Sequence, residues 1–302
     1  MGLQKLSSTD AFVLVDLDGV EHADGIVRLA KKVLVDGART IARSRTYSWA
    51  LLERRISGAS AGINAAPEDR DGAVAAFVDE VTGQVANGSL ALDPGKGLDS
   101  SDLKGLAALH TRSPLADAAR ADLLATGITA AADVALDGVS GTTAVLEGAG
   151  TATSTITKAL TEAGAEVVGT GDGAEVAAIE ADLLVCGSKL GLVDHEVASV
   201  LRQRAIVPCG PAPVTAKGLA VSSRRGIVVM ADFVTLLGPL LAFRHEADAT
   251  PDSLRVDADR TVRQIASDVV GHPDGPYLGA AYRAEEFLRT WRDPLPFGRP
   301  LA

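Results

Sequence analysis

The chain has 302 residues, of which 47% are hydrophobic and only 4% aromatic, and its formal net charge is −10. This length predicts about two domains, each large enough to bury its own core. The acidic balance argues against a nucleic-acid partner, which would need a basic surface. No apolar run approaches the ~20 residues needed to cross a bilayer, so we also expect no membrane partner.

The cysteines and histidines carry little chemistry. Cys186 and Cys209 are too few for a disulfide framework and lack the spacing of metal ligands. The five histidines likewise show no metal-binding spacing. We therefore expect no metal site and a reducing, cytoplasmic setting.

The first half of the chain alternates short apolar runs with longer helical patterns. Residues 11–17, AFVLVDL, predict a strand, and residues 25–55 carry apolar side chains at helical spacing. The DLDG stretch at 16–19 is predicted to form a hairpin turn. Residues 57–63, SGASAGI, are so rich in Gly and Ser that we expect a loop whose backbone comes close to a ligand.

Helix signals follow this stretch. Pro67 and its acidic neighbours suit the first turn of a helix. Ser100 or Ser101 is predicted to cap another helix. A third helix over 128–136 is expected to stop at Gly138.

From there the pattern changes to short buried strands. Residues 142–173 read as strand, tight turn, helix and strand, the size of one βαβ unit. Branched apolar runs follow, as in parallel strands covered on both faces, at 181–188, 205–211 and 226–233. Two amphipathic helices are predicted near the end, over 252–270 and 276–291.

These patterns predict an α/β protein of two domains. We expect an N-terminal α/β domain over residues 1–137, for the substrate or for oligomerisation. A Rossmann-type NAD-binding domain follows over 138–244, and C-terminal helices over 245–302 close back on both.

A glycine turn follows the first strand of the second domain. In Gly148-Ala149-Gly150-Thr151-Ala152-Thr153, the first glycine permits a tight turn and the second lets the backbone approach a pyrophosphate at the helix N-terminus. The third position holds Thr153 in place of Gly or Ala, which leaves the motif incomplete. We predict cofactor contacts from Gly148, Gly150, Thr151, Ala152 and Asp172.

Asp172 predicts which of the two nicotinamide cofactors is preferred. It ends the next predicted strand at roughly the spacing of 20 residues at which a carboxylate accepts hydrogen bonds from the adenosine ribose. An acid there would repel a 2′-phosphate. We therefore expect NAD, with NADP disfavoured.

Several segments together resemble the glutamate/leucine/phenylalanine/valine dehydrogenase family, which oxidatively deaminates amino acids with NAD or NADP. RTYSWA at 45–50 looks like the family's M-T-Y-K-x-A, and SGASAGI at 57–63 looks like G-G-x-K-G-G-I. LATGITAAADVAL at 124–136 and the glycine turn are similar to the next segments in order. The resemblance implies a homo-oligomer and a small-molecule ligand in an interdomain cleft.

The chain departs from the family at the residues that carry its chemistry. Ser48 replaces the lysine that binds the substrate carboxylate, and Ser60 replaces the catalytic lysine. The catalytic aspartate falls on Gly95, with Asp93 or Lys96 as possible substitutes. Two family asparagines fall on Pro211 and Leu236, and Arg43 or Arg45 could replace a lost cation.

These losses decide between functions. Deamination needs a cation for the carboxylate, a lysine of lowered pKa and a carboxylate to move protons. We therefore expect an NAD(P)-binding oxidoreductase that acts on something other than a free amino acid. The alternative is a catalytically silent paralogue that acts as a binding or regulatory subunit. A third hypothesis, a phosphatase, rests on Asp16 and Asp18 as nucleophile and acid.

Overall fold

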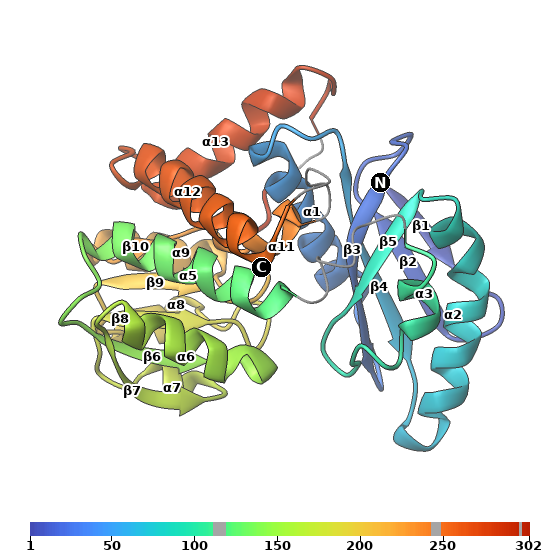
Figure 1. Ribbon diagram of the computed structural model, residues 1–302, viewed down its shortest axis with the longest axis horizontal. Coiled ribbons are helices and arrows are strands. Elements are labelled where there is room, and N and C mark those ends of the chain that lie inside the picture. Colours follow the sequence, from blue (N-terminus) through green and yellow to red (C-terminus); the bar gives the residue numbers. More distant parts are fainter. Residues whose placement is uncertain (111–118, 243–248, 296–297) are drawn as a thin grey trace. The chain divides into compact units, whose positions relative to one another are not determined.

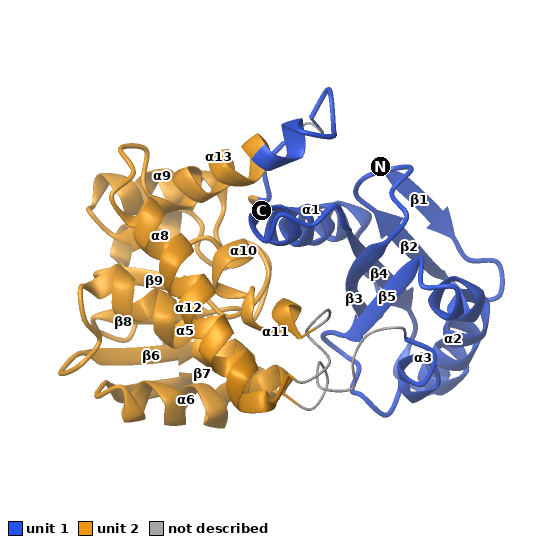
Figure 2. Cartoon of the chain, turned by 45° about the horizontal axis from the view of Figure 1, so that its top comes forward, with its two compact units in different colours: residues 1–111, 287–300 blue, residues 112–286, 301–302 orange. Residues whose placement is uncertain are grey.

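The computed structural model describes residues 1–110, 119–242, 249–295 and 298–302. Figures 1 and 2 show two compact units. Unit 1 comprises Met1–Thr111 and Phe287–Pro300, and unit 2 comprises Arg112–Glu286 and Leu301–Ala302. Each unit holds a five-stranded sheet with helices, so the predicted α/β class, with a parallel Rossmann-type sheet and C-terminal helices, is confirmed.

The sheet of unit 1 is mixed, with strand order β1-β2-β4-β3-β5. Neighbours β1, β2 and β4 run antiparallel, whereas β4, β3 and β5 run parallel. Helix α1 packs on β4 over one face, and α2 packs on β4 and β5 over the other. The bounds are β1 Gly2–Lys5, β2 Ala11–Val15, β3 Ala23–Ala30, β4 Ser57–Asn64, β5 Leu90–Pro94, α1 Val35–Leu51, the 3₁₀ turn Pro67–Asp69, α2 Arg70–Ala86 and α3 Lys104–Ala107.

Two sequence predictions in this unit are wrong. Residues 25–30 belong to strand β3, and the helix begins only at Val35. The expected Gly/Ser loop at 57–63 is the buried strand β4 in the sheet interior. Small residues are needed there because a Cβ on Gly58 would lie 1.8 Å from the Ala42 carbonyl oxygen of α1, and one on Gly25 would lie 1.9 Å from the Ala59 carbonyl.

The expected hairpin after β2 and the expected serine cap are also wrong. Asp18 and Gly19 do form a turn, but β3 pairs with β4 and β5, so β4 lies between β2 and β3. Helix α3 follows Leu103, which makes no side-chain cap, and Ser101 Oγ donates instead to Asp99.

Unit 2 contains an all-parallel sheet in the order β10-β9-β8-β6-β7. The strand order reverses beside β6, and ligands of open parallel sheets bind outside the carboxyl ends of the strands at such a point. The predicted βαβ unit is present, because β6, α6 and β7 follow one another. The bounds are β6 Thr143–Glu147, α6 Thr153–Glu162, β7 Glu166–Gly171, α7 Ala174–Ala177, β8 Leu183–Cys186, α8 His195–Val200, β9 Ala205–Pro208, α9 Ala216–Arg224, β10 Val228–Val229, α10 Asp232–Thr235 and α11 Gly238–Leu241.

One long helix of unit 2 packs on this sheet, and a second packs on that helix. Helix α5 (Arg120–Leu136) contacts α6, β9 and α12. The two C-terminal helices α12 (Pro251–Val270) and α13 (Pro276–Arg289) lie where the sequence predicts them. No described helix combines the length and the apolar character that crossing a membrane requires.

The compact units and the predicted domains divide the chain differently. Helix α5 belongs to unit 2, whereas the predicted first boundary, after residue 137, assigns it to the first domain. The second predicted boundary, at 244 and 245, lies outside the described residues. The predicted division into domains 1–137, 138–244 and 245–302 stays a prediction.

Candidate functional site

One face of the unit 1 sheet gathers polar side chains around Ile26. In the sheet register, Ile26 of β3 lies opposite Ser60 of β4 and opposite Asp93 of β5. Asp24 and Arg28 stand two residues before and after it on the same strand and therefore on the same face. We call these five residues the Ile26 cluster.

The cluster is unusual because charged and polar side chains are buried on a sheet face. Asp24, Ser60 and Asp93 are buried, whereas Ile26 and Arg28 are partly exposed. A strand buried on this face normally carries apolar side chains, because an unpaired buried polar group costs roughly 1–3 kcal/mol. Three carboxylate or guanidinium groups here therefore require partners.

Arg45 of α1 is the partner of two of these groups, Asp24 and Asp93. Its Nε lies 2.5 Å from Asp24 Oδ2, and its Nη2 lies 3.5 Å from Asp93 Oδ2. Trp49 Nε1 donates to the same Asp24 oxygen at 3.1 Å. Burial raises the pKa of Asp24, Arg45 opposes that rise, and the neighbouring Asp93 adds to it. Arg45 is thus bound to carboxylates of its own chain and is not the free cation that the sequence analysis considered.

Four atoms of the cluster, on three residues, have no hydrogen-bond partner among the described residues. Asp24 Oδ1, Ser60 Oγ, and both Nε and Nη2 of Arg28 are buried without one among the described residues. Burial lowers the pKa of Arg28. The sequence analysis missed Arg28 because its helix prediction placed the residue among surface basic groups, and only alternation with Asp24 and Ile26 would have signalled a strand face.

Ser48, the other serine at which the sequence resemblance expects a lysine, lies on α1 and is buried. Its Oγ donates to the Ser44 carbonyl oxygen of the same helix at 3.3 Å. Ser48 is not a member of the Ile26 cluster, so the structure does not bring the two serines to the same set of unpaired groups.

Arg43 and Asp16 form a separate buried ion pair. Arg43 Nε and Nη2 lie 2.7 and 2.8 Å from the two Asp16 oxygens, and Thr46 Oγ1 donates to Asp16 at 2.7 Å. The Asp16 side chain has no exposed surface. A nucleophilic carboxylate needs an open face toward the phosphate, so this geometry argues against the phosphatase hypothesis.

The remaining predicted acid positions follow β5. A Cβ on Gly95 would lie 2.8 Å from the Val27 carbonyl oxygen and 3.2 Å from Arg28 Cγ, so an acidic side chain would require the neighbours to shift. Lys96 is exposed in the turn beyond it. Of the two possible substitutes, Asp93 lies in the Ile26 cluster and Lys96 does not.

In unit 2, the glycine turn directly follows β6. Gly148 and Gly150 both have positive φ, of 69° and 54°. A Cβ on Gly148 would lie 2.1 Å from the Ser188 backbone nitrogen, whereas one on Gly150 would meet no atom within 4 Å. Gly148 is thus required by packing, and Gly150 leaves open space. The turn continues through the 3₁₀ segment Gly150–Ala152, in which Thr151 is exposed and Ala152 is buried, into α6.

Asp172 is exposed immediately after β7, at the carboxyl edge of the strand next to β6. The structure therefore places the predicted ribose-binding acid and the glycine turn at the ends of two neighbouring parallel strands. Thr153, the residue that makes the motif incomplete, donates its hydroxyl to the Gly150 carbonyl at 2.8 Å.

Glu147 is a buried acid at this edge that the sequence analysis did not single out. Its carboxylate accepts hydrogen bonds from the backbone nitrogens of Gly173 at 2.7 Å, Gly187 at 3.1 Å and Ser188 at 3.2 Å. It thereby ties together the segments that follow β6, β7 and β8. An acid between an apolar strand and a glycine turn is the signal that could have found it.

Pro211 and Leu236, where the sequence resemblance expects asparagines, belong to segments of unit 2 that a hydrogen bond joins. Pro211 follows β9 and precedes Ala212, a non-glycine residue with φ of 43°. The Ala212 backbone nitrogen donates to Asp232 Oδ2 at 2.8 Å, and Leu236 ends the short helix that begins at Asp232. A side chain buried under this loop therefore holds its backbone in a strained conformation.

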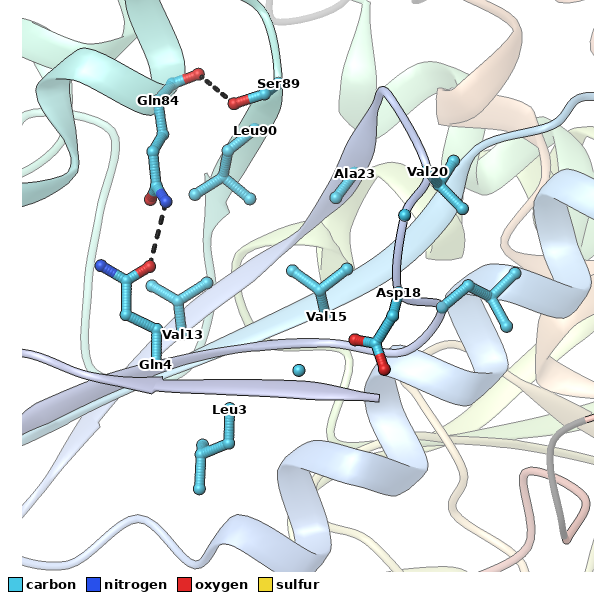
Figure 3. Close-up of a pocket in the computed structure, with 13 residues that line it drawn as sticks. Leu3, Gln4, Val13, Val15, Asp18, Val20, Ala23, Gln84, Ser89 and Leu90 are labelled. Carbon is cyan, nitrogen blue, oxygen red and sulfur yellow. Dashed lines mark hydrogen bonds between the residues drawn. The ribbon is translucent and has the colours of Figure 1, made fainter.

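Unit 1 also has a pocket of about 360 Å³ on the sheet face that α2 covers, opposite the Ile26 cluster (Figure 3). Aliphatic side chains such as Val13, Val15 and Leu90 line it, and Gln84 donates to Gln4 at 3.0 Å across it. Its carboxylate, Asp18, is paired with the N-terminal amine. The pocket therefore offers apolar contact and no acid–base pair.

No group of three or more His, Cys, Asp or Glu side chains among the described residues is arranged to hold a metal ion. Cys186 and Cys209 are both free thiols. Burial raises the pKa of Cys209 to about 12 and that of Cys186 well above its usual value. Neither is an activated nucleophile.

Comparison with solved structures identifies the fold. The chain superposes on a hetero-hexameric glutamate dehydrogenase from Thermus thermophilus in its leucine-bound form (TM-score 0.76, 16% identity, 95% of this chain and 86% of that one). It also superposes on an L-tryptophan dehydrogenase from Nostoc punctiforme (TM-score 0.69, 14% identity, 96% of both chains). A glutamate dehydrogenase from Plasmodium falciparum gives a TM-score of 0.74 at 12% identity, over 92% and 77% of the two chains.

The chain therefore has the fold of the glutamate and amino-acid dehydrogenases, and the resemblance seen in its sequence segments is confirmed at that level. No protein-family model and no curated protein sequence matches it. The identities are low, so the likeness extends to the fold, and the chemistry has to be argued from the residues of this chain.

Proposed function

We propose that the protein is an NAD-dependent oxidoreductase whose substrate is not a free α-amino acid. The observation that carries the proposal is the edge of the unit 2 sheet, where the turn at Gly148 and Gly150 and the carboxylate of Asp172 follow neighbouring strands beside the point of strand reversal. A pyrophosphate would lie over the open space at Gly150, near the α6 N-terminus.

The unit 1 residues support the second half of the proposal. Ser60 stands where the family's catalytic lysine is expected, and a serine hydroxyl neither ionises near neutral pH nor replaces the positive charge that polarises an imine. Asp24 and Asp93 remain as carboxylates that could accept or donate a proton. A reaction that needs hydride transfer and proton movement, without an amine-activating lysine, fits this set.

Calorimetric titration with NAD, NADH and NADP tests the cofactor half. NAD and NADH are expected to bind at concentrations below about 1 mM, the upper range of ordinary KM values, and NADP to bind more weakly. Asp172→Asn should reduce the preference for NAD over NADP. Glu175→Gln, which removes an exposed acid three residues further on, is the matched control. Absence of binding by both NAD and NADH would contradict the proposal.

The second candidate is a catalytically silent paralogue that regulates an active dehydrogenase. It is favoured by Ser48 and Ser60, which stand where the resemblance expects the family's two lysines and whose hydroxyls cannot supply the positive charges. The similar Thermus thermophilus glutamate dehydrogenase is a hetero-hexamer, which is an assembly of unlike chains. This function predicts that adding the protein changes the activity of a dehydrogenase partner, and turnover of any substrate by the protein alone would exclude it.

Oligomeric state belongs to the same proposal. We propose a homo-oligomer, which light scattering of the purified chain tests directly. A monomer at micromolar concentration would remove this part and would leave the cofactor proposal intact. The cytoplasmic setting stays a prediction.

A further inference from the structure

Glu147, the last residue of β6, reaches the segments that follow two neighbouring strands. Its Oε1 accepts a hydrogen bond from the Gly173 nitrogen after β7 at 2.7 Å, and its Oε2 accepts from the nitrogens of Gly187 and Ser188 after β8 at 3.1 and 3.2 Å. The Glu147 side chain is buried. Because both oxygens are bound to the backbone, Glu147 is not placed to act as an acid or base on a substrate.

Two hydrogen bonds hold the predicted ribose-binding acid from both sides. The Gly148 nitrogen donates to the Gly171 carbonyl oxygen at 2.8 Å, and the Gly173 nitrogen donates to Glu147 Oε1. Asp172 lies between these two glycines, whose φ angles are 153° and 99°. Glycine restrains the backbone least of all residues. The place of Asp172 relative to the glycine turn therefore depends on these two bonds.

A carboxylate at position 147 is required for all three bonds. Both of its oxygens accept, whereas a carboxamide has one accepting oxygen and an NH₂ group that only donates. In the orientation that keeps two of the three bonds, a glutamine would turn its oxygen to Gly187 and Ser188 and its NH₂ group to the N–H of Gly173. Glu147→Gln thus releases the bond that holds the Asp172 segment.

We propose that Glu147 is a positioning residue that sets the preference for NAD over NADP by holding Asp172 beside the glycine turn. A fixed carboxylate accepts hydrogen bonds from the adenosine ribose of NAD and repels the 2′-phosphate of NADP. Once its segment is released, Asp172 can turn away, which weakens NAD binding and relieves the repulsion of NADP. The inference rests on the proposed NAD-dependent function and adds the residue that gives the cofactor preference.

Calorimetric titration of the full chain with NAD and with NADP tests the proposal through the ratio of the two dissociation constants. Glu147→Gln should lower the preference for NAD about 10-fold, the loss of roughly one hydrogen bond. A merely structural role would weaken the binding of both dinucleotides by the same factor and leave the preference unchanged. An unchanged preference in a folded Glu147→Gln protein would overturn the proposal.

A combined variant separates positioning from direct repulsion. The charge of Glu147 could itself repel a 2′-phosphate, and its loss would then also lower the preference for NAD. If Glu147 acts through Asp172, adding Glu147→Gln to Asp172→Asn should leave the preference of the Asp172→Asn protein unchanged. If the two effects multiply, Glu147 acts independently and the proposal is wrong.

Asp182→Asn is the matched control, because it makes the same exchange of carboxylate for carboxamide at the other end of β6. Asp182 directly precedes β8, and its Oδ2 accepts from the backbone nitrogen of Thr143, the first residue of β6, at 2.9 Å. The variant should lower the melting temperature and keep the wild-type preference for NAD. A fall in preference as large as that of Glu147→Gln would show that loosening the sheet is sufficient, which would contradict the proposal.

A second variant covers the case in which Glu147→Gln does not fold. Glu147→Asp keeps the charge, but its side chain is one methylene shorter and cannot reach Gly173 and Ser188 at once, so it should also lower the preference for NAD. Absence of binding of both NAD and NADH to the wild type would remove the proposed function and this inference with it. NAD binding without a preference over NADP, or with a preference that the folded Glu147 variants keep, would remove this inference alone.

Discussion

The two units hold five-stranded sheets of the same size, yet they differ in how their polar groups are satisfied. In unit 2, the buried acid Glu147 accepts three backbone hydrogen bonds, and the turn beside it keeps both glycines. In unit 1, Asp24, Ser60 and Arg28 each bury an atom without a partner. Polar groups that serve structure alone are normally paired. Unit 2 also buries hydroxyls without a partner, at Thr129 and Ser222, so what distinguishes unit 1 is that three such residues share one sheet face.

The largest effect is expected from the ion pair that does serve structure in unit 1. Asp16→Ala leaves Arg43 buried without its carboxylate partner, and such a change typically costs about 3–5 kcal/mol. Both tryptophans, Trp49 and Trp291, belong to unit 1, so urea unfolding followed by their fluorescence measures it. Asp36→Ala, which breaks an exposed pair with Arg39, should cost no more than about 0.5 kcal/mol. Equal costs would contradict the structural role of Asp16.

The next largest loss of stability is expected from substitutions in the glycine turn of unit 2. Gly148→Ala combines a left-handed backbone with a Cβ that would lie 2.1 Å from the Ser188 nitrogen, and it should destabilise unit 2 by about 2–5 kcal/mol. Gly150→Ala has only the backbone strain and should cost about 1–2 kcal/mol. Thermal unfolding followed by circular dichroism compares them. If Gly150→Ala proved the more damaging, the packing argument would be wrong.

A smaller difference in stability is expected between substitutions of Ser48 and Ser60, the two serines at which the sequence resemblance expects lysines. Ser60→Ala removes a buried hydroxyl that has no partner, so the unfolding free energy should rise by about 1 kcal/mol. In Ser48→Ala, the hydrogen bond to Ser44 is lost while helix propensity improves, and the net change should lie within about 0.5 kcal/mol of zero. A clear loss of stability in Ser60→Ala would show that its hydroxyl is satisfied in solution.

The smallest effect is a pH dependence. The pKa of Asp24 is raised above its ordinary value of 3.8 in the folded protein, so the folded state holds this proton more tightly than the unfolded state. The corresponding stability is present below 3.8 and is lost as the pH rises through the folded-state pKa. Asp24→Asn should therefore flatten the fall of unfolding free energy that follows as the pH rises above the ordinary Asp pKa of 3.8. An unchanged slope would assign the dependence to another group.

Local sequence patterns predicted the strands and helices of unit 2 correctly but mispredicted β3 and β4 of unit 1. The reason is physical. The β6-α6-β7 unit is made of neighbours in the chain, and its glycines and strand-end acid are visible in thirty or so residues. Strands β3 and β4 depend on contacts with α1 and with each other. Glycines that allow Ala42 and Ala59 to approach look, in sequence, like loop glycines.

The residues of the candidate site also differ in whether the sequence alone could predict them. Ser60 and Asp93 could be found by alignment to motifs, and Asp172 by spacing along the chain. Arg28 could not, because its significance is that Nε and Nη2 lack a partner, and pairing is a property of the folded sheet. Arg45 illustrates the converse, since a plausible replacement cation turns out to be held by Asp24 and Asp93.

The contact between Gly58 and the Ala42 carbonyl also bears on how such a protein diverges. With 1.8 Å between that oxygen and the place of a Cβ, helix α1 rests on the bare backbone of β4. The helix is therefore located by a residue that has no side chain, whereas Ser60, whose hydroxyl has no partner among the described residues, can be exchanged without loss of a contact to the helix. We therefore expect substitutions at residue 60 to leave the fold intact and substitutions at residue 58 to disrupt it. The residue that fixes the position of the helix would then differ from the residue that is free to change its chemistry.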